Sequence, residues 1–213
     1  MGRLYFIRHG QTDSNSGKMF QGQMDTPLNV AGLDQAEQMA EYMKGLKLDA
    51  IYCSSLMRAR MTAAPLALAK NMAYRPVEGL KEVSFGAWEG VSFKTLHAEH
   101  GEEMRTFLEQ PGEFTPPEGE SFGEAQERCV AALMDILAKE GHDKNIAIVT
   151  HGGIIRLFVC YFLGIPLNNL WKMAIRNVSV TTVYDGEGAF MVEAVNDDHF
   201  LKNVTSQGYI SIV

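Results

Sequence analysis

Short apolar runs alternate along most of the chain with stretches whose apolar residues recur at helical spacing. The runs at 4–7, 49–53 and 144–150 predict strands, and a shorter run at 75–77 predicts another. Alternation of this kind is typical of a sheet with helices packed on it. The run at 144–150 has no polar alternation, so we expect this strand to be buried on both faces.

Side chains that bond the first amide groups of a helix mark where several helices begin. Asn29 is one such cap, and Ser121 with Glu124 forms a capping box before a long helix with an apolar stripe. Ser54 and Ser55 are expected to cap the helix that follows the second strand.

A hairpin is expected near the C-terminus. Two apolar runs, 178–184 and 189–195, flank the sequence Asp185-Gly186-Glu187-Gly188. Asp and Gly favour a tight turn, so the two runs predict an antiparallel strand pair.

The region from about 91 to 120 differs in character from the rest of the chain. It begins with helical spacing and then becomes rich in proline and glycine, as in Pro116-Pro117-Glu118-Gly119. Such an excursion between core elements predicts a lid or specificity segment inserted in a single domain that spans 1–213. A surface insertion without function is the alternative.

Composition narrows the class of protein. A formal net charge of −7 argues against a nucleic-acid binder, which normally presents a basic face. The apolar runs are too short to span a membrane, and the chain does not open with a signal-peptide pattern. The three cysteines are widely spaced and odd in number, as expected of free thiols in a reducing compartment. We therefore expect a cytoplasmic protein with no nucleic-acid or membrane partner. Its oligomeric state stays open, a homodimer included.

The first strand runs directly into Arg8, His9 and Gly10. A guanidinium offers a planar fork of donors that matches a phosphate, and a glycine lets the backbone approach a ligand closely. Thr12 and Asn15 add short polar side chains further on. A histidine at a strand end is usually a satisfied polar residue, but beside this arginine a nucleophilic imidazole suits phosphoryl transfer.

The strand at 144–150 ends in a similar way, at His151 and Gly152 before a helix. Backbone amides at a helix N-terminus favour an anion. Because open α/β sheets build their sites at the carboxyl ends of strands, we expect His9 and His151 at one edge of the sheet. The alternative is that His151 only caps the helix.

Two further kinds of charged residue are candidates. Arg58 lies early in a helix, where its charge is unfavourable unless an anion compensates. Glu82 and Glu89 flank Phe85-Gly86-Ala87-Trp88, and burial beside aromatic rings raises the pKa of a carboxyl group, as a general acid requires. These residues alone do not decide between the two glutamates, and either is otherwise an exposed loop carboxylate. Two histidines and a carboxylate also suit a metal, but neighbouring arginines would repel a cation.

The candidate residues belong to a longer, ordered set of motifs. The set comprises Arg8-His9-Gly10, Gln21-Gly22, Ser54-x-Leu56-x-Arg58-Ala59, Glu82-x-x-Phe85-Gly86-x-Trp88-Glu89-Gly90, Pro117-x-Gly119-Glu120-Ser121 and His151-Gly152-Gly153-x-x-Arg156. With this set the chain resembles the histidine phosphatase superfamily, also called the phosphoglycerate mutase-like family. The resemblance implies a three-layer αβα sandwich with a mostly parallel central sheet and an antiparallel C-terminal strand pair.

The same resemblance implies a two-step mechanism on a small-molecule phosphate ester, with no metal and no cofactor. His9 would attack phosphorus and become a phosphohistidine, which water then hydrolyses. Glu82 rather than Glu89 would give the leaving oxygen its proton. The residues expected to hold the phosphoryl oxygens are Arg8, Arg58 and His151, and those expected to line the phosphate and substrate site are Thr12, Asn15, Gln21, Gly22 and Gly152.

Within this family the residues favour a phosphatase over a mutase. The mutase branch typically has tyrosine, lysine and asparagine where this chain has Phe85, Phe93 and Gly153. The 91–120 region carries seven glutamates against one lysine and one arginine, Lys94 and Arg105, so it is poorly suited to hold a second phosphate. The motifs are most similar to those of the α-ribazole phosphatases, and many broad-specificity members share them. A cofactor-dependent phosphoglycerate mutase and a non-catalytic phosphate-binding module are the alternatives.

Overall fold

The computed structural model describes residues 2–186 and 189–202, and within that part six strands form one sheet. In chain order the strands are β1 (Gly2–Arg8), β2 (Ala50–Ser54), β3 (Tyr74–Val77), β4 (Ile146–Thr150), β5 (Val180–Gly186) and β6 (Ala189–Asp197). Their spatial order is β3-β2-β4-β1-β5-β6; β1 to β4 are parallel, and β5 pairs antiparallel with both β1 and β6. The expected mostly parallel sheet with an antiparallel C-terminal pair is confirmed. Of the predicted turn, residues 187–188 lie outside the described part.

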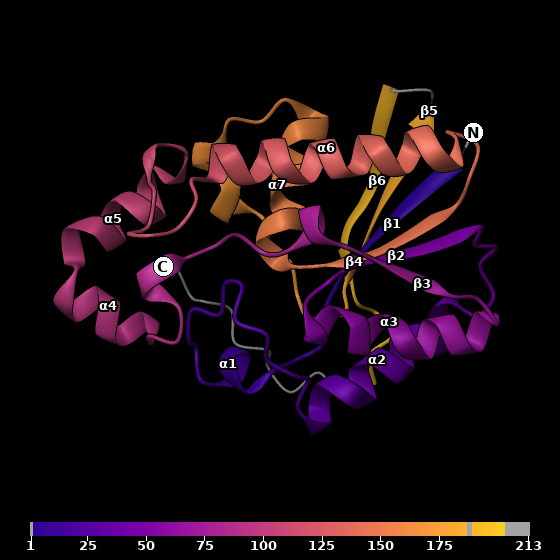
Figure 1. Ribbon diagram of the computed structural model, residues 1–213, viewed down its shortest axis with the longest axis horizontal. Helices are drawn as coiled ribbons and strands as arrows, with labels where there is room; N and C mark the ends of the chain where they lie inside the picture. The colour runs from indigo at the N-terminus through magenta and orange to yellow at the C-terminus, as the bar shows by residue number, and fades with distance from the viewer. Residues whose placement is uncertain (1, 187–188, 203–213) are drawn as a thin grey trace.

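Helices cover both faces of the sheet, as the αβα arrangement requires (Figure 1). α2 (Val30–Met43) and α3 (Met57–Lys70) pack on one face, and α6 (Phe122–Glu140) and α7 (Gly152–Leu163) pack on the other. The connections hold the short helix α1 (Asp13–Ser16) and the 3-10 turns η1 (Glu78–Leu80), η2 (Gly86–Trp88), η3 (Pro111–Glu113) and η4 (Leu167–Lys172). In the described part of the chain, no helix is long and apolar enough to cross a membrane.

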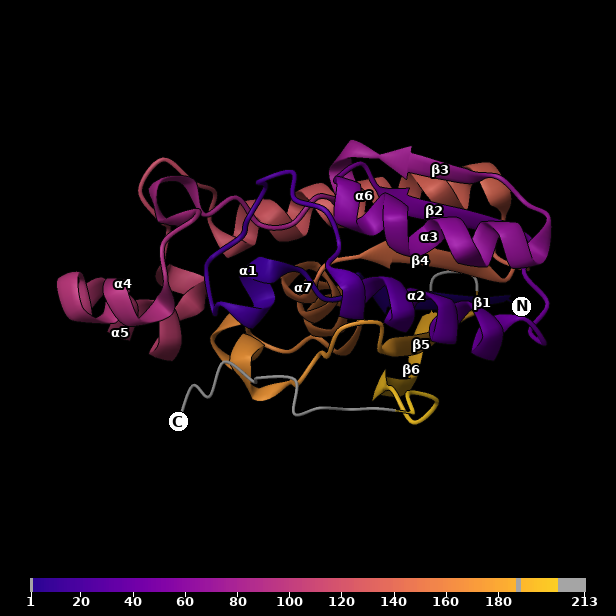
Figure 2. The same ribbon diagram turned by 90° about the horizontal axis from the view of Figure 1, so that it is seen from below.

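The 91–120 region contains two short helices, α4 (Phe93–Glu99) and α5 (Gly101–Glu109). Figure 2 shows both helices projecting beyond the end of the sheet at which β1, β2 and β4 finish. The base of this projection is firmly packed. The rings of Phe107 and Trp171 lie 4.8 Å apart between centroids, and Nε1 of Trp171 donates to the Phe107 carbonyl at 2.7 Å.

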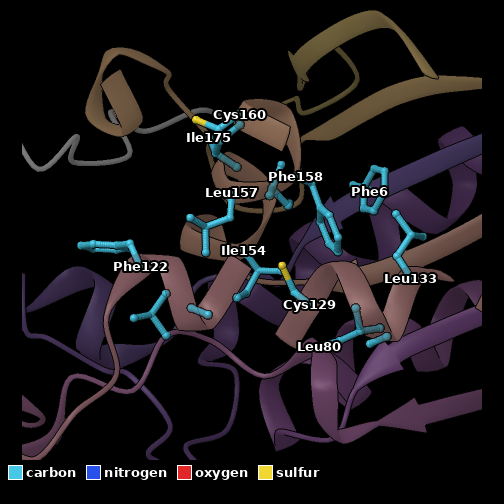
Figure 3. Packing of buried hydrophobic residues seen from close by; sticks show 14 of the residues in the cluster. Phe6, Leu80, Phe122, Cys129, Leu133, Ile154, Leu157, Phe158, Cys160 and Ile175 are labelled. Atoms are coloured by element: carbon cyan, nitrogen blue, oxygen red, sulfur yellow. The ribbon is translucent and has the colours of Figure 1, made fainter. Parts of the chain in front are cut away.

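Alternate side chains of the central strands enter two separate cores. Leu4 and Phe6 of β1 pack toward α6 and α7, whereas Tyr5 and Ile7 pack toward α2 and α3. Every residue of β4 is buried, so the expectation of burial on both faces is confirmed. Figure 3 shows part of the first core, where the rings of Phe6 and Phe158 lie 4.8 Å apart. Both helical layers therefore fix where the central strands end.

The capping predictions are confirmed at two helices and wrong at a third. Asn29 caps α2, and Ser121 with Glu124 forms the capping box of α6. At α3 the N-cap residue is Leu56, with no capping bond from a side chain. Ser54 bonds a histidine of the site instead, because β2 ends one residue later than the predicted strand at 49–53 and keeps Ser54 in the sheet.

The loop after β1 touches the first turn of α2 through backbone atoms. A Cβ atom at Gly10 would lie 2.5 Å from the carbonyl oxygen of Gly32, and one at Gly32 would collide with the carbonyl oxygen of Gln11. Main-chain atoms cannot move aside as the end of a flexible side chain can. Glycine at both positions thus lets α2 support the loop that carries His9.

We expect Gly32→Ala to lower the free energy of unfolding by about 1–3 kcal/mol, because the methyl group overpacks this backbone contact. The better helix propensity of alanine opposes the loss by at most about 1 kcal/mol. Chemical denaturation followed by circular dichroism measures the change. Gly45→Ala is the control, since a Cβ there meets nothing within 4 Å. Equal stability of the two variants would contradict the prediction.

Candidate active site

The register of β1 and β4 brings the two histidines together. Arg8 pairs with Thr150 across the parallel strands, and the backbone N–H of His9 donates to the Thr150 carbonyl at 2.9 Å. The rings of His9 and His151 consequently lie 5.2 Å apart between centroids. The expectation that both histidines stand at one edge of the sheet is confirmed.

His9 is held in one tautomer. Its Nδ1 lies 2.7 Å from the carbonyl oxygen of Gly10, which can only accept, so Nδ1 carries the hydrogen and Nε2 carries the lone pair. Only 3% of His9 is exposed. This burial, together with the charges of Arg58 and Arg8, holds the pKa of His9 well below 6.5. At neutral pH the side chain is an uncharged imidazole with Nε2 available for bonding.

Arg58 lies entirely beneath the surface at the start of α3. Its Nη1 and Nη2 donate to the carbonyls of Met24 and Gly22, each at 2.7 Å. Gly22 has a φ of +50°, a conformation that glycine adopts without strain, and this turns its carbonyl toward the guanidinium. Burial lowers the pKa of Arg58 to about 10, so the group remains charged at neutral pH. Its buried Nε has no hydrogen-bond partner among the described residues.

Arg8, like Arg58, has a buried Nε without a hydrogen-bond partner among the described residues. Its Nη1 donates to the carbonyl of Ile175 at 2.6 Å. Buried donors are normally satisfied, and two unpaired guanidinium N–H groups in one place favour a bound anion.

His151 occupies the N-cap position of α7 but makes no capping bond, so the alternative that it merely caps this helix is wrong. Its Nε2 lies 2.7 Å from the hydroxyl oxygen of Ser54, which also accepts the N–H of Leu56 at 3.3 Å. The pKa of His151 is well below 6.5 because of burial and the nearby charge of Arg58. The ring is therefore neutral. Because the Ser54 hydroxyl has no other acceptor for its hydrogen among the described residues, we infer that the Ser54 O–H donates to Nε2. The hydrogen then sits on Nδ1, which is buried and lacks a partner among the residues described.

The two candidate glutamates occupy different places. The carboxylate of Glu82 accepts the N–H of Gly153 at the start of α7 at 3.1 Å and its neighbouring Val83 N–H at 3.0 Å. Its charge acts on Arg8, and it acts on Arg58 more strongly than the charge of Glu89 does. The carboxylate of Glu89 instead joins two loops, accepting the N–H of Gln23 at 2.9 Å and of Phe85 at 3.1 Å. The geometry therefore favours Glu82 as the carboxyl group of the site.

Several residues expected to bind phosphate form a frame around the loop after β1. The hydroxyl of Thr12 lies 3.1 Å from both the Asn15 and the Gln21 side-chain oxygens, and Thr12 also caps α1. Asn177 joins this frame, with its Nδ2 donating to the His9 carbonyl at 2.9 Å and to Asn15 at 3.2 Å.

The sequence reasoning missed the contributions of Asn177 and Ser54. Asn177 is 168 positions from His9 and lies just before β5, where no motif or spacing marked it. Ser54 belongs to one of the motifs above, but the sequence assigns it only the role of a helix cap. Gly152 lies beside Arg8, since a Cβ there would stand 3.3 Å from Nε of Arg8. In the part of the chain that is described, no three His, Cys, Asp or Glu side chains are grouped so that they could hold a metal ion.

Comparison with known proteins shows which family this chain is similar to. The model of the histidine phosphatase superfamily (branch 1) matches residues 4–198. A putative phosphoserine phosphatase 2 of Hydrogenobacter thermophilus is 34% identical over 90% of this chain and 94% of its own. An adenosylcobalamin/α-ribazole phosphatase of Escherichia coli is 29% identical over 81% and 85%. Proteins named probable phosphoglycerate mutase also match.

A solved structure has the same fold over almost the whole chain. It is a phosphoserine phosphatase mutant of Entamoeba histolytica in complex with phosphoserine. The TM-score is 0.85 at 29% identity, and the match covers 94% of this chain and 100% of that one.

Removal of the Arg58 charge should raise the pKa of His9. A nearby positive charge disfavours the imidazolium, so Arg58→Met favours protonation, and the buried imidazole will take up its proton at a higher pH than in the wild type. NMR titration of the His9 ring nitrogens measures this shift. Arg60→Met on the same helix is the control and should leave the titration in place. An unchanged pKa in Arg58→Met would show that this charge does not act on His9.

Ser54→Ala should allow the His151 ring to populate both of its neutral tautomers. Without the hydroxyl, Nε2 loses its donor and the proton is no longer confined to Nδ1. The ¹⁵N shifts of the ring should report a mixture of tautomers, and kcat/KM for a phosphate monoester should fall about tenfold. The neighbouring variant Ser55→Ala removes the same atom without touching His151 and should change neither quantity.

Proposed function

The chain belongs to branch 1 of the histidine phosphatase superfamily and is a hydrolase of small phosphate monoesters, and we propose that it works through a phosphohistidine on His9. The observation that carries the proposal is the state of His9. Its Nδ1–H is committed to the Gly10 carbonyl, its positive charge is suppressed by burial and by two arginines, and Nε2 keeps its lone pair. A neutral imidazole beside unpaired buried donors is a nucleophile next to an anion site.

In the first step Nε2 of His9 attacks phosphorus while the bond from phosphorus to the ester oxygen breaks. The electron pair of that bond passes to the leaving oxygen, which takes a proton from the Glu82 carboxyl group, and this group enters the step protonated. The unpaired N–H groups of Arg8, Arg58 and His151 bind the phosphoryl oxygens, on which negative charge is spread in the transition state. The products of this step are the free alcohol and a phosphohistidine.

In the second step a water molecule attacks phosphorus from the side that the alcohol has left. Glu82, now a carboxylate, accepts the proton of this water. The bond between phosphorus and Nε2 breaks, and its electrons return to the imidazole of His9. Inorganic phosphate leaves, and both residues are back in their starting states.

The 91–120 region is proposed as the segment that shapes the leaving-group pocket. It projects beyond the strand ends at which His9 and His151 stand, and its base is packed through Phe107. The region carries seven glutamates, so its field disfavours a leaving group with a second phosphate, as a mutase would need. We propose α-ribazole phosphate as the substrate because the motifs around Phe85 and Pro117 are most similar to those of the α-ribazole phosphatases.

Turnover of p-nitrophenyl phosphate by the purified protein tests the mechanism. We expect hydrolysis that persists in EDTA and is inhibited by vanadate, together with a phosphoprotein that is labile in acid and stable in base, as a phosphohistidine is. His9→Ala should lose activity at least about a thousandfold and form no phosphoprotein. Because the pKa of His9 is held low, kcat/KM should not fall as the pH drops just below 6.5.

The control is His142→Ala, which removes a partly exposed imidazole just before β4, at the opposite end of that strand from His151, and should retain full activity. Activity that disappears in EDTA while His9→Ala keeps it would refute the phosphohistidine mechanism. A substrate panel with α-ribazole phosphate, phosphoserine and 3-phosphoglycerate then separates the substrates. Conversion of 3-phosphoglycerate to 2-phosphoglycerate would make the protein a mutase.

A further inference from the structure

Arg128 of α6 is bonded to the segment that carries Glu82. Its Nη1 donates to the carbonyl of Gly79 at 2.9 Å and to that of Lys81 at 3.0 Å. Its Nη2 donates to the carbonyl of Glu82 itself at 3.3 Å. Three peptide groups are thus attached to one guanidinium, two before the Glu82 side chain and one directly after it.

Glu120, just before α6, holds the same segment from the other side. Its backbone N–H donates to the Ser84 carbonyl at 3.0 Å, and its Oε1 accepts the Ser84 N–H at 2.8 Å. The two carboxylate oxygens of Glu120 also accept Nη2 and Nε of Arg128, at 2.6 and 3.1 Å. Arg128 and Glu120 therefore form one bidentate ion pair that grips the backbone on both sides of Glu82.

Every N–H of the Arg128 guanidinium is used in these contacts. A guanidinium has five donors, and the five bonds lead to three backbone carbonyls and to both oxygens of Glu120. Arg8 and Arg58 differ, since each keeps a buried N–H without a partner among the described residues. Arg128 has no donor left for a ligand, so its contribution to the site is to the position of the chain.

The Glu82 side chain depends on where this backbone lies. Its carboxylate bridges the Val83 N–H of its own segment and the Gly153 N–H of α7. A Cβ atom at Gly153 would lie 2.5 Å from Oε1 of Glu82, so the carboxyl group also stands in tight contact with the helix. A displacement of the Glu82 backbone would move the carboxyl group away from the leaving oxygen, and a shift of about 1 Å is enough to slow a reaction about a hundredfold.

We propose that Arg128 and Glu120 are positioning residues for proton transfer by Glu82. The pair fixes the backbone from Gly79 to Ser84 so that the carboxyl group meets the leaving oxygen as its bond to phosphorus breaks. This inference rests on the proposed function, in which Glu82 is the proton donor. It assigns a role to Glu120 of the motif Pro117-x-Gly119-Glu120-Ser121, which has no part in the chemical steps above.

A misplaced proton donor changes the relative rates of hydrolysis of two kinds of phosphate ester, whereas partial unfolding of the protein does not. An alkoxide is strongly basic and needs a proton as it leaves, whereas p-nitrophenolate is weakly basic and leaves without one. Loss of proton transfer therefore slows the hydrolysis of an alkyl phosphate much more than the hydrolysis of p-nitrophenyl phosphate. The ratio of kcat/KM for the two substrates cancels the concentration of active enzyme, so it remains valid for a variant that is only partly folded.

The test compares this aryl-to-alkyl ratio, with phenethyl phosphate as the alkyl ester, in Arg128→Met, Arg128→Lys and Glu120→Gln. We expect the ratio to rise about tenfold or more in Arg128→Met, because up to a hundredfold is lost on the alkyl ester alone. Arg128→Lys keeps the charge but has three donors in place of five, so its ratio should also rise. In the double variant of Arg128→Met and Glu120→Gln the two effects should not add, since both act through one ion pair.

Two controls separate the possible outcomes. Arg75→Met removes an arginine that pairs with Glu140 at the far end of α6, and it should leave the ratio unchanged. Glu82→Gln should raise the ratio at least as much as Arg128→Met does. A raised ratio in Glu82→Gln with an unchanged ratio in Arg128→Met would overturn the positioning role alone. An unchanged ratio in Glu82→Gln would overturn both this inference and the assignment of Glu82 as proton donor.

Discussion

The site depends on positive charge that is buried without a full set of partners. Arg58 is fully buried and Arg8 is partly buried, and a charge removed from water is unfavourable unless it is paired or hydrogen-bonded. Backbone carbonyls satisfy part of each guanidinium, and one buried N–H of each is left over. The oxygens of a dianionic phosphoryl group would accept both of these N–H groups. Burial, together with the same charges, keeps His9 and His151 neutral, so the positive charge that would bind an anion also helps to leave the lone pair of His9 Nε2 free of a proton.

The sheet sets the distances between these groups. β1 and β4 are adjacent and parallel, and their side chains enter cores on both faces, so neither strand can slip without exposing apolar residues. Their last residues therefore meet in a fixed register, with His9 bonded to the Thr150 carbonyl. The glycines that follow serve close backbone packing. Gly10 is pressed against Gly32, although the sequence suggested that it faced a ligand.

The arginines of the site divide into two kinds by the donors they leave unused. Arg8 and Arg58 each retain a buried N–H group without a partner among the described residues. In Arg128 all five N–H donors bond to other residues of the protein. A guanidinium can hold substrate or hold backbone, and the count of its bonds distinguishes the two roles. Glutamates divide in a similar way, since Glu82 faces the charged groups while Glu89 and Glu120 join loops.

The sequence by itself determined the order of strands and helices, because apolar spacing reflects burial directly, and it marked Arg8, His9, Arg58 and His151 through local motifs. It also indicated most caps, which depend on residues three positions apart. It could not find Asn177 or the bond between Ser54 and His151, and from the residues alone it left Glu82 and Glu89 unresolved. These depend on contacts between residues 71 to 168 positions apart, which arise only when the strands pair and α7 packs on the sheet. Only the tertiary structure decides which polar groups lack a hydrogen-bond partner. A donor can be recognised as unpaired only when the positions of all its neighbours are known.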